Sequence, residues 1–229
     1  TCPSGVHYMH LVDHARVHIE ETYKRPFINR MTRNMLTRIL PYRDRFAFAT
    51  RLSVLGKPFA SLFDKVTPLK PIAAMLRLAP SKIYGKTEFT SPGSFKPEKQ
   101  TQGRVTILTG CAQPALDAGI NKATIELLNR VGVEVVLPEG EGCCGALVHH
   151  MGKEHQALES AKNNVRIWHE EIEKNGLDAI IVTTSGCGTT IKDYGFMLRN
   201  DAEWAERAAK VSSLAMDISE YLVLKEIIT

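Results

Sequence analysis

The feature that most constrains the fold is a series of short apolar runs that alternate with helical patterns. The apolar runs cover residues 105–109, 133–137 and 179–183. Helical patterns cover residues 121–131, 154–175, 189–198, 202–209 and 219–228. Strands separated by helices imply right-handed crossovers between parallel strands. The sequence therefore predicts a Rossmann-like α/β module with a mainly parallel sheet over residues 104–229.

Four of the five cysteines lie just beyond the ends of these predicted strands. Cys111 follows the first run, Cys143 and Cys144 follow the second, and Cys187 follows the third. In a parallel sheet the loops after the strands emerge at one carboxyl edge, where open α/β folds place their sites. We therefore expect the four thiols to meet, although they are far apart along the chain.

The residues around these cysteines favour a metal centre. Each site is flanked by glycine, which lets backbone N–H groups approach a sulfur atom, and the helices that follow favour the thiolate form. Adjacent cysteines are poorly oriented for a disulfide with each other. Soft thiolates select iron–sulfur clusters, zinc or copper(I). The pattern thus indicates an iron–sulfur centre rather than four separate, inert cysteines.

Three other motifs near the cysteines leave alternatives open. His149 and His150 are either ligands or proton donors, or surface residues at the start of a helix. Residues 140–142 resemble part of a dinucleotide fingerprint but lack its third glycine. Cys144 with a distant histidine would suit a thiol nucleophile, but the sequence identifies no orienting Asn or Asp.

The segment before the module is strongly basic. Residues 24–104 contain 17 Lys/Arg and 4 Asp/Glu, whereas the rest of the chain contains 12 and 21. Frequent prolines divide residues 24–85 into short helices, and residues 90–97 are expected to form a loop. Such a segment fits a solvated helix surface, nucleic acid, an anionic membrane surface, or an acidic partner subunit that docks on its arginines. The arginines in question are Arg30, Arg33, Arg38, Arg43 and Arg45.

The beginning of the chain looks like the tail of a truncated domain, because it opens on Cys2-Pro3 without a methionine. A helix is expected at residues 11–22, where His7, His10, His14 and His18 are spaced three or four residues apart. A solvated helix face is favoured for these histidines over a metal site. No apolar run reaches the ~18–20 residues of a membrane span and no secretory signal is present, so we expect a cytoplasmic protein.

Longer strings around the cysteines resemble a known family. LTGCAQP at residues 108–114, LPEGEGCCGAL at 137–147 and TSGCG at 184–188 are similar to the cysteine-rich "CCG" module of heterodisulfide reductases and of lactate-utilisation proteins. They look most like the iron–sulfur subunit of bacterial glycolate oxidase (glycolate dehydrogenase). TCPSGV at residues 1–6 resembles the last ligand motif of that subunit's ferredoxin-type domain.

The resemblance implies a domain organisation and a set of ligands. Residues 1–23 would be the tail of a ferredoxin-type domain, 24–103 a helical basic linker, and 104–229 the cysteine-rich α/β module. Cofactor and metal ligands would be the five cysteines, with a [4Fe–4S] cluster as the cofactor and zinc as the alternative in the module. These ligands are Cys2, Cys111, Cys143, Cys144 and Cys187.

The resemblance also implies an activity. The intact protein would be an electron-transfer component of an oxidoreductase, with no catalytic residue of its own for the substrate. A flavoprotein subunit carrying FAD would oxidise glycolate to glyoxylate and pass electrons through this subunit to an acceptor other than oxygen. The complex would be cytoplasmic, with peripheral attachment to the inner face of the membrane as an open alternative; no nucleic acid is expected as a partner.

The chain departs from the heterodisulfide-reductase pattern at one position. That pattern ends in Cys-x-x-Cys, whereas here Thr190 stands three residues after Cys187. This difference argues against a noncubane cluster of the reductase type. A heterodisulfide reductase-like or lactate-utilisation oxidoreductase, and a zinc-stabilised docking scaffold, are the alternative functions.

Overall fold

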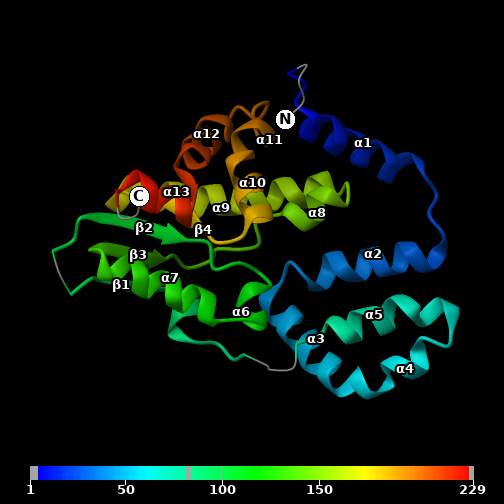
Figure 1. Cartoon of the computed structure of the whole chain (residues 1–229). Coiled ribbons are helices and arrows are strands. Elements are labelled where there is room, and N and C mark those ends of the chain that lie inside the picture. Colours follow the sequence, from blue (N-terminus) through cyan, green and yellow to red (C-terminus); the bar gives the residue numbers. More distant parts are fainter. Residues whose placement is uncertain (1–4, 81–83, 99, 227–229) are drawn as a thin grey trace.

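The computed structural model describes residues 5–80, 84–98 and 100–226. Its centre is a five-stranded sheet in the order β1-β3-β2-β4-β5 (Figure 1). The strands are β1 (Gly93–Phe95), β2 (Gly103–Ile107), β3 (Val133–Leu137), β4 (Ala179–Val182) and β5 (Ala215–Asp217). Strands β3, β2, β4 and β5 are parallel, and β1 runs antiparallel to β3 at one edge. The predicted α/β fold with a mainly parallel sheet is confirmed.

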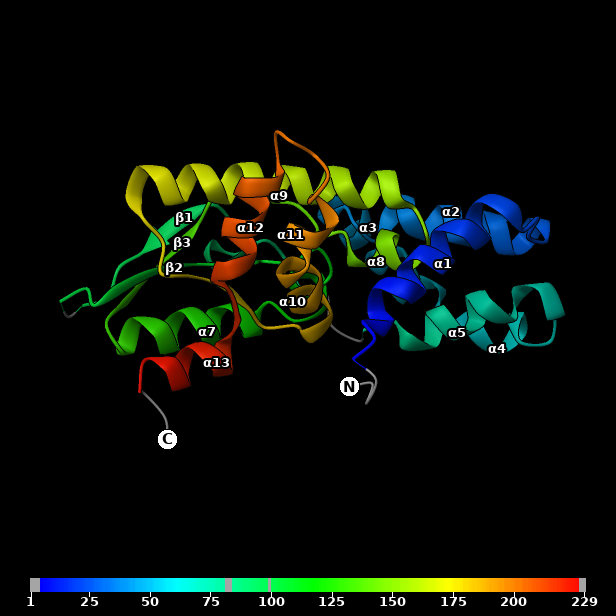
Figure 2. The ribbon, with the colours of Figure 1, turned by 90° about the horizontal axis from the view of Figure 1, so that it is seen from above.

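Helices cover both faces of the sheet, which is why the central strands are apolar on both sides. Helices α9 (Glu154–Asn175) and α12 (Ala205–Leu214) lie on one face, and α7 (Gly119–Arg130) and α13 (Ile218–Leu224) lie on the other (Figure 2). Strand β4 is buried along its whole length. Its Ile180 and Val182 pack in the α9 core, whereas Ala179 and Ile181 pack in the α7 core.

The long helix α9 shows how the sequence sets this packing. Its apolar residues recur at helical spacing, so they form one stripe that faces the sheet. Ala157, Ala161, Val165 and Trp168 of that stripe are fully buried. Small alanines on the stripe let the helix approach closely, and the large Trp168 side chain fills the space beneath it.

Four short helices lie at the carboxyl edge of the sheet. They are α6 (Gln113–Leu116), α8 (Ala146–His150), α10 (Ser185–Lys192) and α11 (Tyr194–Met197). Helices α6, α8 and α10 each begin within a few residues of a cysteine of the predicted site. The chain turns into a helix soon after Cys111 and the Cys143–Cys144 pair, and Cys187 lies within the first turn of α10.

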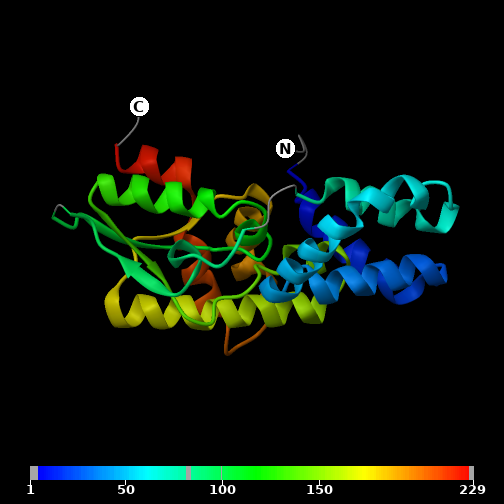
Figure 3. The same cartoon turned by 90° about the horizontal axis from the view of Figure 1, so that it is seen from below.

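The N-terminal half forms a helical lobe beyond this edge (Figures 2 and 3). It contains α1 (Tyr8–Thr22), α2 (Phe27–Ile39), α3 (Arg43–Gly56), α4 (Ala60–Phe63) and α5 (Lys70–Leu78). Short 3₁₀ turns at Lys57–Phe59, Thr67–Leu69 and Glu88–Thr90 connect or follow these helices, the first two with proline in the first turn. Helix α3 packs against α6, and α1 packs against α8, so the lobe covers the edge that carries the cysteines.

Several element predictions need correction. The loop predicted at residues 90–97 contains β1, because its backbone completes the sheet beside β3. Strand β5 was not predicted, since three residues carry no periodic signal. The single helix predicted at residues 189–198 is two helices, and the first begins at Ser185. The strand at Val133–Leu137 and the helix at Glu154–Asn175 are confirmed at their predicted bounds.

Candidate metal centre

The structure brings the four module cysteines together, as predicted. Cys111 lies in the loop after β2, and Cys143 and Cys144 lie in the loop after β3. Cys187 lies in the first turn of α10 rather than in the preceding loop. The thiols contact one another in series: Cys111 hydrogen-bonds with Cys143, Cys143 with Cys144, and Cys144 with Cys187. Topology alone therefore assembles one cluster from three loops.

The cluster is buried at its centre and reaches the surface at its ends. Cys143 and Cys144 are 8% and 2% exposed. Cys111 and Cys187 are partly exposed, and all four cysteines are free thiols. All four pack in the same hydrophobic core as Trp168 and Tyr194. The arrangement shields two sulfur atoms from water and leaves the outer two nearest to solvent.

Packing keeps the thiols of Cys111, Cys143 and Cys144 protonated. The hydrogen bond with Cys143 and then burial raise the pKa of Cys111. The hydrogen bond with Cys111 lowers the pKa of Cys143, but the one with Cys144 and burial outweigh it and raise that pKa to about 11. In the same way Cys143 lowers the pKa of Cys144, whereas Cys187 and burial raise it to about 12. A metal that binds here must displace protons, after which its charge stabilises the thiolates.

The chemistry of this donor set fits an iron–sulfur cluster or a zinc ion, since both accept four thiolate ligands. In the part of the chain that the structure describes, no three His, Cys, Asp or Glu side chains surround a common point as a ready metal site. The thiols instead contact each other in a chain from Cys111 to Cys187. Metal binding therefore requires them to exchange these mutual contacts for bonds to the metal.

A buried carboxylate joins two of the cysteine loops. Glu141 lies two residues before Cys143, and its side chain is 3% exposed. Its Oε1 accepts hydrogen bonds from the Thr109 backbone N–H at 2.9 Å and from the Thr109 hydroxyl at 2.7 Å. Burial raises the pKa of Glu141, although its contacts with Thr109 and Arg43 oppose that shift. Glu141 thus fixes the Cys143 loop to the end of β2.

Arg43 of α3 ties the helical lobe to the same place. Its Nε donates to the Gly110 carbonyl oxygen at 2.8 Å, directly beside Cys111, and its Nη2 lies 3.2 Å from Glu141 Oε1. Its Nη1 also donates to the Thr90 carbonyl oxygen at 3.4 Å. One guanidinium therefore contacts the Cys111 loop, the Cys143 loop and the segment that leads into β1. Arg43 is an internal residue of the site and not a free docking arginine.

A second polar group supports the Cys143–Cys144 pair from behind. Asn164 of α9 accepts a hydrogen bond from the Gly142 backbone N–H at 2.9 Å and donates to the Cys143 carbonyl oxygen at 3.2 Å. The buried Tyr194 hydroxyl donates to the Cys144 carbonyl oxygen at 2.8 Å. Burial, and then the nearby Cys144, raises the pKa of Tyr194 well above its usual range. Tyr194 therefore remains a neutral donor that holds the loop.

Gln113 connects the Cys111 loop to the Cys187 loop. Its Oε1 accepts hydrogen bonds from the hydroxyls of Thr183 and Thr184 at 3.2 and 3.1 Å. Its Nε2 donates to Asn121 Oδ1 at 2.5 Å, and Asn121 donates to the Thr109 carbonyl oxygen at 3.3 Å. The three cysteine loops are thus linked by a connected polar frame, which is the kind of support that orients metal ligands.

Glycine is required at one point in this frame. Gly145 has φ +84°, and a Cβ there would lie 3.2 Å from the Ala157 carbonyl oxygen of α9. The Gly145 backbone N–H also points at the Cys143 sulfur, at 3.5 Å. The Cys-Cys-Gly sequence therefore combines two thiols with a left-handed turn that side chains rarely adopt.

The polar residues of this frame were not predicted from the sequence. One signal could have indicated Asn164, because it is a polar residue that lies beside the apolar stripe of α9. Arg43, Gln113 and Tyr194 act over 67, 70 and 50 residues of sequence, so no local pattern marks them. Cys2, the fifth predicted ligand, lies outside the described residues, and its role stays a prediction.

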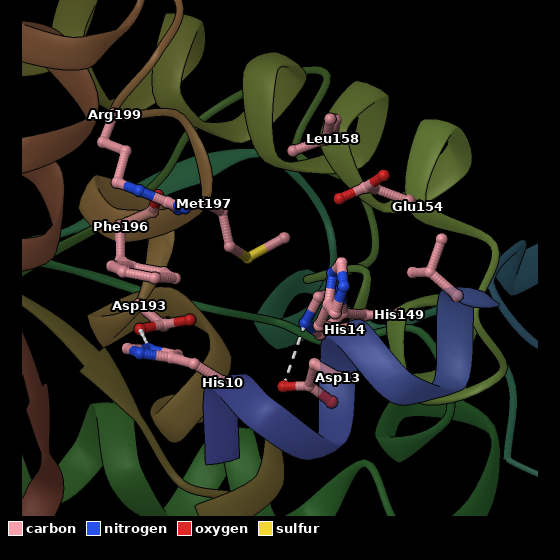
Figure 4. A pocket seen from close by; sticks show the side chains of 11 residues that line it. His10, Asp13, His14, His149, Glu154, Leu158, Asp193, Phe196, Met197 and Arg199 are labelled. Atoms are coloured by element: carbon pink, nitrogen blue, oxygen red, sulfur yellow. Dashed lines mark hydrogen bonds and ion pairs between the residues drawn. The ribbon is translucent and has the colours of Figure 1, made fainter. Parts of the chain in front are cut away.

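The predicted histidine features lie at the contact between α1 and the module (Figure 4). His10 Nε2 lies 2.8 Å from Asp193 Oδ1, and His149 Nε2 lies 3.2 Å from the buried Asp13. His14 lines the same cavity of about 220 Å³. His7, His14 and His18 are exposed, in line with the favoured solvated face, whereas His10 and His149 are half-buried. These two histidines pair with carboxylates across a helix contact.

The fold and the four-thiol site define a class of protein. Residues 105–192 match the family model described as "Cysteine-rich domain" (CCG), and all four cysteines of the site lie within this match.

Relatives match nearly the whole chain. It is 37% identical over 222 residues to the "Glycolate oxidase iron-sulfur subunit" of Escherichia coli (strain K12) and 32% identical over 232 residues to the "Probable glycolate oxidase iron-sulfur subunit" of Bacillus subtilis (strain 168). Each match covers 97% of this chain, and 50% and 51% of the relative, respectively. The resemblance to the iron–sulfur subunits of bacterial glycolate oxidase is confirmed.

A more distant relative matches part of the chain. The "Lactate utilization protein A" of Bacillus subtilis (strain 168) is 26% identical over 120 residues, which is 52% of this chain and 48% of that protein. The chain spans about half the length of the curated relatives it matches. No solved structure matches it significantly. Among the described residues, no helix is both long and apolar enough to cross a membrane.

Proposed function

We propose that this chain is part of an iron–sulfur electron-transfer subunit of a glycolate oxidase or dehydrogenase complex. In this role it takes electrons from an FAD-containing flavoprotein that oxidises glycolate to glyoxylate, and it passes them to an acceptor other than oxygen. The observation that carries the proposal is the meeting of Cys111, Cys143, Cys144 and Cys187 at one sheet edge. The names of the two relatives that match 97% of the chain supply the substrate and the complex.

The residues of this chain would hold and tune the centre. The four module thiols are its ligands, and Cys2 is a ligand of a separate cluster in the ferredoxin-type tail. A bound iron–sulfur cluster supplies one-electron chemistry that side chains alone lack. Burial of Cys143 and Cys144 excludes water from two ligands, and the Gly145 N–H directs a positive dipole at the Cys143 sulfur. Nothing in this chain acts on glycolate under this proposal.

Thr190 bears on the heterodisulfide reductase-like alternative. It occupies the position of the last cysteine in a Cys-x-x-Cys sequence. Its side chain is buried, and its hydroxyl donates to the Gly186 carbonyl oxygen at 3.0 Å within α10. A threonine in a satisfied intrahelical hydrogen bond offers no thiolate ligand. The four remaining thiols match the ligand requirement of one ordinary four-iron cluster, or of zinc in a docking scaffold.

Metal analysis tests the proposed cofactor. After anaerobic reconstitution with iron and sulfide, we expect about four iron and four sulfide per module, broad visible absorption, and an electron paramagnetic resonance signal on reduction. The Cys144→Ser variant should lose the module's iron, whereas the Cys2→Ser variant should retain it. One equivalent of zinc with no iron would refute the cluster assignment and favour the zinc-stabilised scaffold.

We also propose that the basic segment docks the flavoprotein. Two of the arginines are already engaged within the chain and are poor candidates for docking. Arg33 donates to Glu20 and to the Met151 carbonyl oxygen, and Arg43 belongs to the cysteine frame. Arg30 and Arg38 of α2 line an open groove and remain candidates. Charge reversal of Arg30 and Arg38 should weaken assembly of the complex, measured by co-purification at low salt. The control is charge reversal of Arg166 and Lys174 on α9. If the Arg30/Arg38 variant assembled as well as this control, the docking role would be refuted.

We also propose that the helical lobe makes peripheral contact with an anionic membrane. Large apolar side chains are exposed there among lysines and arginines, which is the composition of helices that lie in a membrane interface. They include Leu52, Leu55, Leu62 and Leu78. Co-sedimentation with vesicles containing phosphatidylglycerol, but not with phosphatidylcholine vesicles, would support this contact. No binding to either vesicle type would refute it.

A further inference from the structure

The two ends of the thiol chain are more exposed than its centre. Cys143 and Cys144 are buried, whereas Cys111 and Cys187 are partly exposed. The outer thiols therefore offer a redox partner a closer approach to the centre than the buried pair does. The surroundings of the outer thiols therefore select the redox partner.

A cavity of about 510 Å³ opens beside Cys111. Helix α3 of the lobe forms one wall with Arg43, Phe48 and Arg51, and residues 84–92 and α6 form the others. Phe48 is 61% exposed, so the wall presents an aromatic surface to whatever occupies the opening. The cavity leads from solvent to a cysteine of the thiol chain without passing through the core.

The charged residues of this cavity are mainly basic. Arg43, Arg51 and Lys86 face one acidic residue, Asp44. Arg43 is neutralised by the buried Glu141. Lys86 lies 3.0 Å from Asp44, but both side chains are about 80% exposed, so this pair is screened by water and holds neither group firmly. Arg51 and Lys86 thus leave a positive rim, which continues the +13 charge of residues 24–104.

The other opening near the thiols differs in charge. A cavity of about 410 Å³ reaches Cys143 between the lobe and α9, and it is lined by His155 and Glu159. It carries no lysine or arginine in the part of the chain that the structure describes. Of these two openings, the one at Cys111 carries the positive rim and the one at Cys143 does not.

From this contrast we propose that the Cys111 rim is the docking surface for the acidic face of a partner redox protein, and that electrons cross at Cys111. The inference rests on the proposed electron-transfer function and adds the place and sign of the contact. Complementary charge raises the association rate of such partners. Electron-transfer interfaces are small and weak, which fits the small area of this rim.

Small charged oxidants test the field at this rim. The anaerobically reconstituted, reduced chain is mixed rapidly with ferricyanide or with hexaammineruthenium(III), and cluster oxidation is followed by absorbance. The Arg51→Glu/Lys86→Glu variant should slow oxidation by ferricyanide about tenfold at low salt and accelerate oxidation by hexaammineruthenium(III). The Arg166→Glu/Lys174→Glu variant changes the net charge equally and should leave both rates near those of the parent. Equal effects of the two variants would overturn the proposal.

A second measurement needs no cluster, so it separates this inference from the proposed function. In the metal-free chain, alkylation of Cys111 by the anion iodoacetate is compared with alkylation by neutral iodoacetamide, using peptide mass spectrometry. The iodoacetate preference should fall several-fold in Arg51→Glu/Lys86→Glu, with Cys187 as the internal reference. An unchanged preference would refute the positive rim. If the iodoacetate preference falls in the variant but the chain binds no iron, the positive rim is supported and only the cluster assignment is refuted.

Competition distinguishes a protein surface from a small ligand. Polyglutamate, as a mimic of an acidic protein face, should protect Cys111 from alkylation at concentrations where inorganic phosphate of equal total charge does not. The Arg51→Glu/Lys86→Glu variant should lose this protection, and the Arg166→Glu/Lys174→Glu variant should keep it. Protection by phosphate without protection by polyglutamate would overturn the docking surface and indicate a small anion site.

Discussion

At the scale of single residues, polar side chains behind the thiols determine where the thiols lie. Glu141, Gln113 and Asn164 each contact the backbone or the hydroxyl groups of another loop, and none of them is a predicted ligand. Their hydrogen bonds are buried or partly buried, so a fully buried one left unmade would cost roughly 1–3 kcal/mol and a partly buried one less. Precision at the sulfur atoms therefore depends on amides and a carboxylate as much as on the cysteines.

Replacement of Asn164 tests this dependence. Asn164→Ala leaves the Gly142 N–H and the Cys143 carbonyl without their partner, so the free energy of unfolding should fall by about 2–4 kcal/mol. The reconstituted variant should also lose iron faster to a chelator. Urea unfolding followed by circular dichroism measures the first effect, and iron release measures the second. The exposed Asn175→Ala is the control, and equal iron retention in both variants would contradict a positioning role.

At the scale of elements, local sequence predicted what local sequence can determine. The bounds of β3 and α9 followed from uninterrupted apolar or amphipathic patterns. Cys111, Cys143, Cys144 and Cys187 were placed at one edge because parallel topology leaves no other arrangement. Strands β1 and β5 escaped prediction, since each has three residues and owes its conformation to pairing with a neighbouring strand. The polar frame escaped for the same reason, because its bonds join residues that are far apart in sequence.

The start of α13 provides a test of an element by pH. Asp217 accepts hydrogen bonds from the Ser219 hydroxyl and backbone N–H, and these bonds lower the pKa of Asp217. Glu220 completes the capping box. Because the pKa of Asp217 is lower in the folded state, its carboxylate stabilises the fold fully above the unfolded-state pKa. This stabilisation is lost as the pH falls through the folded-state pKa. Asp217→Ala should cost about 1 kcal/mol at neutral pH and almost nothing once the pH lies below the lowered folded-state pKa of Asp217.

Urea midpoints of the parent and the Asp217→Ala variant, measured from pH 7 to pH 2, check this expectation. Glu203→Ala is a suitable control, because Glu203 is exposed and lies outside the capping box. A difference between parent and variant that stays constant down to pH 2 would show that the carboxylate charge is irrelevant to the cap.

At the scale of the whole molecule, the lobe and the module share the site. Residues 24–103 were expected to act as a linker, yet β1 comes from this segment and Arg43 reaches the Cys111 loop. The boundary at residue 104 stays a prediction, but the cysteine edge is bounded on one side by α3 and on the other by the module itself. Partner binding on the lobe would therefore act close to the thiols.

The Arg43–Glu141 pair tests this coupling between the two parts. Arg43→Gln leaves the buried Glu141 carboxylate without its cation, which should lower the free energy of unfolding by about 3 kcal/mol and weaken iron retention. Glu141→Gln in the same chain removes the uncompensated charge, so the double variant should recover part of both losses. The double-mutant cycle is measured twice, once as the free energy of unfolding in urea and once as the rate of iron release. Arg45→Gln is the control, because Arg45 stacks on Tyr42 and does not contact Glu141. Additive losses in the double variant would show that the two side chains act independently. A recovery would show instead that α3 of the lobe is energetically coupled to the Cys143 loop through the Arg43–Glu141 pair.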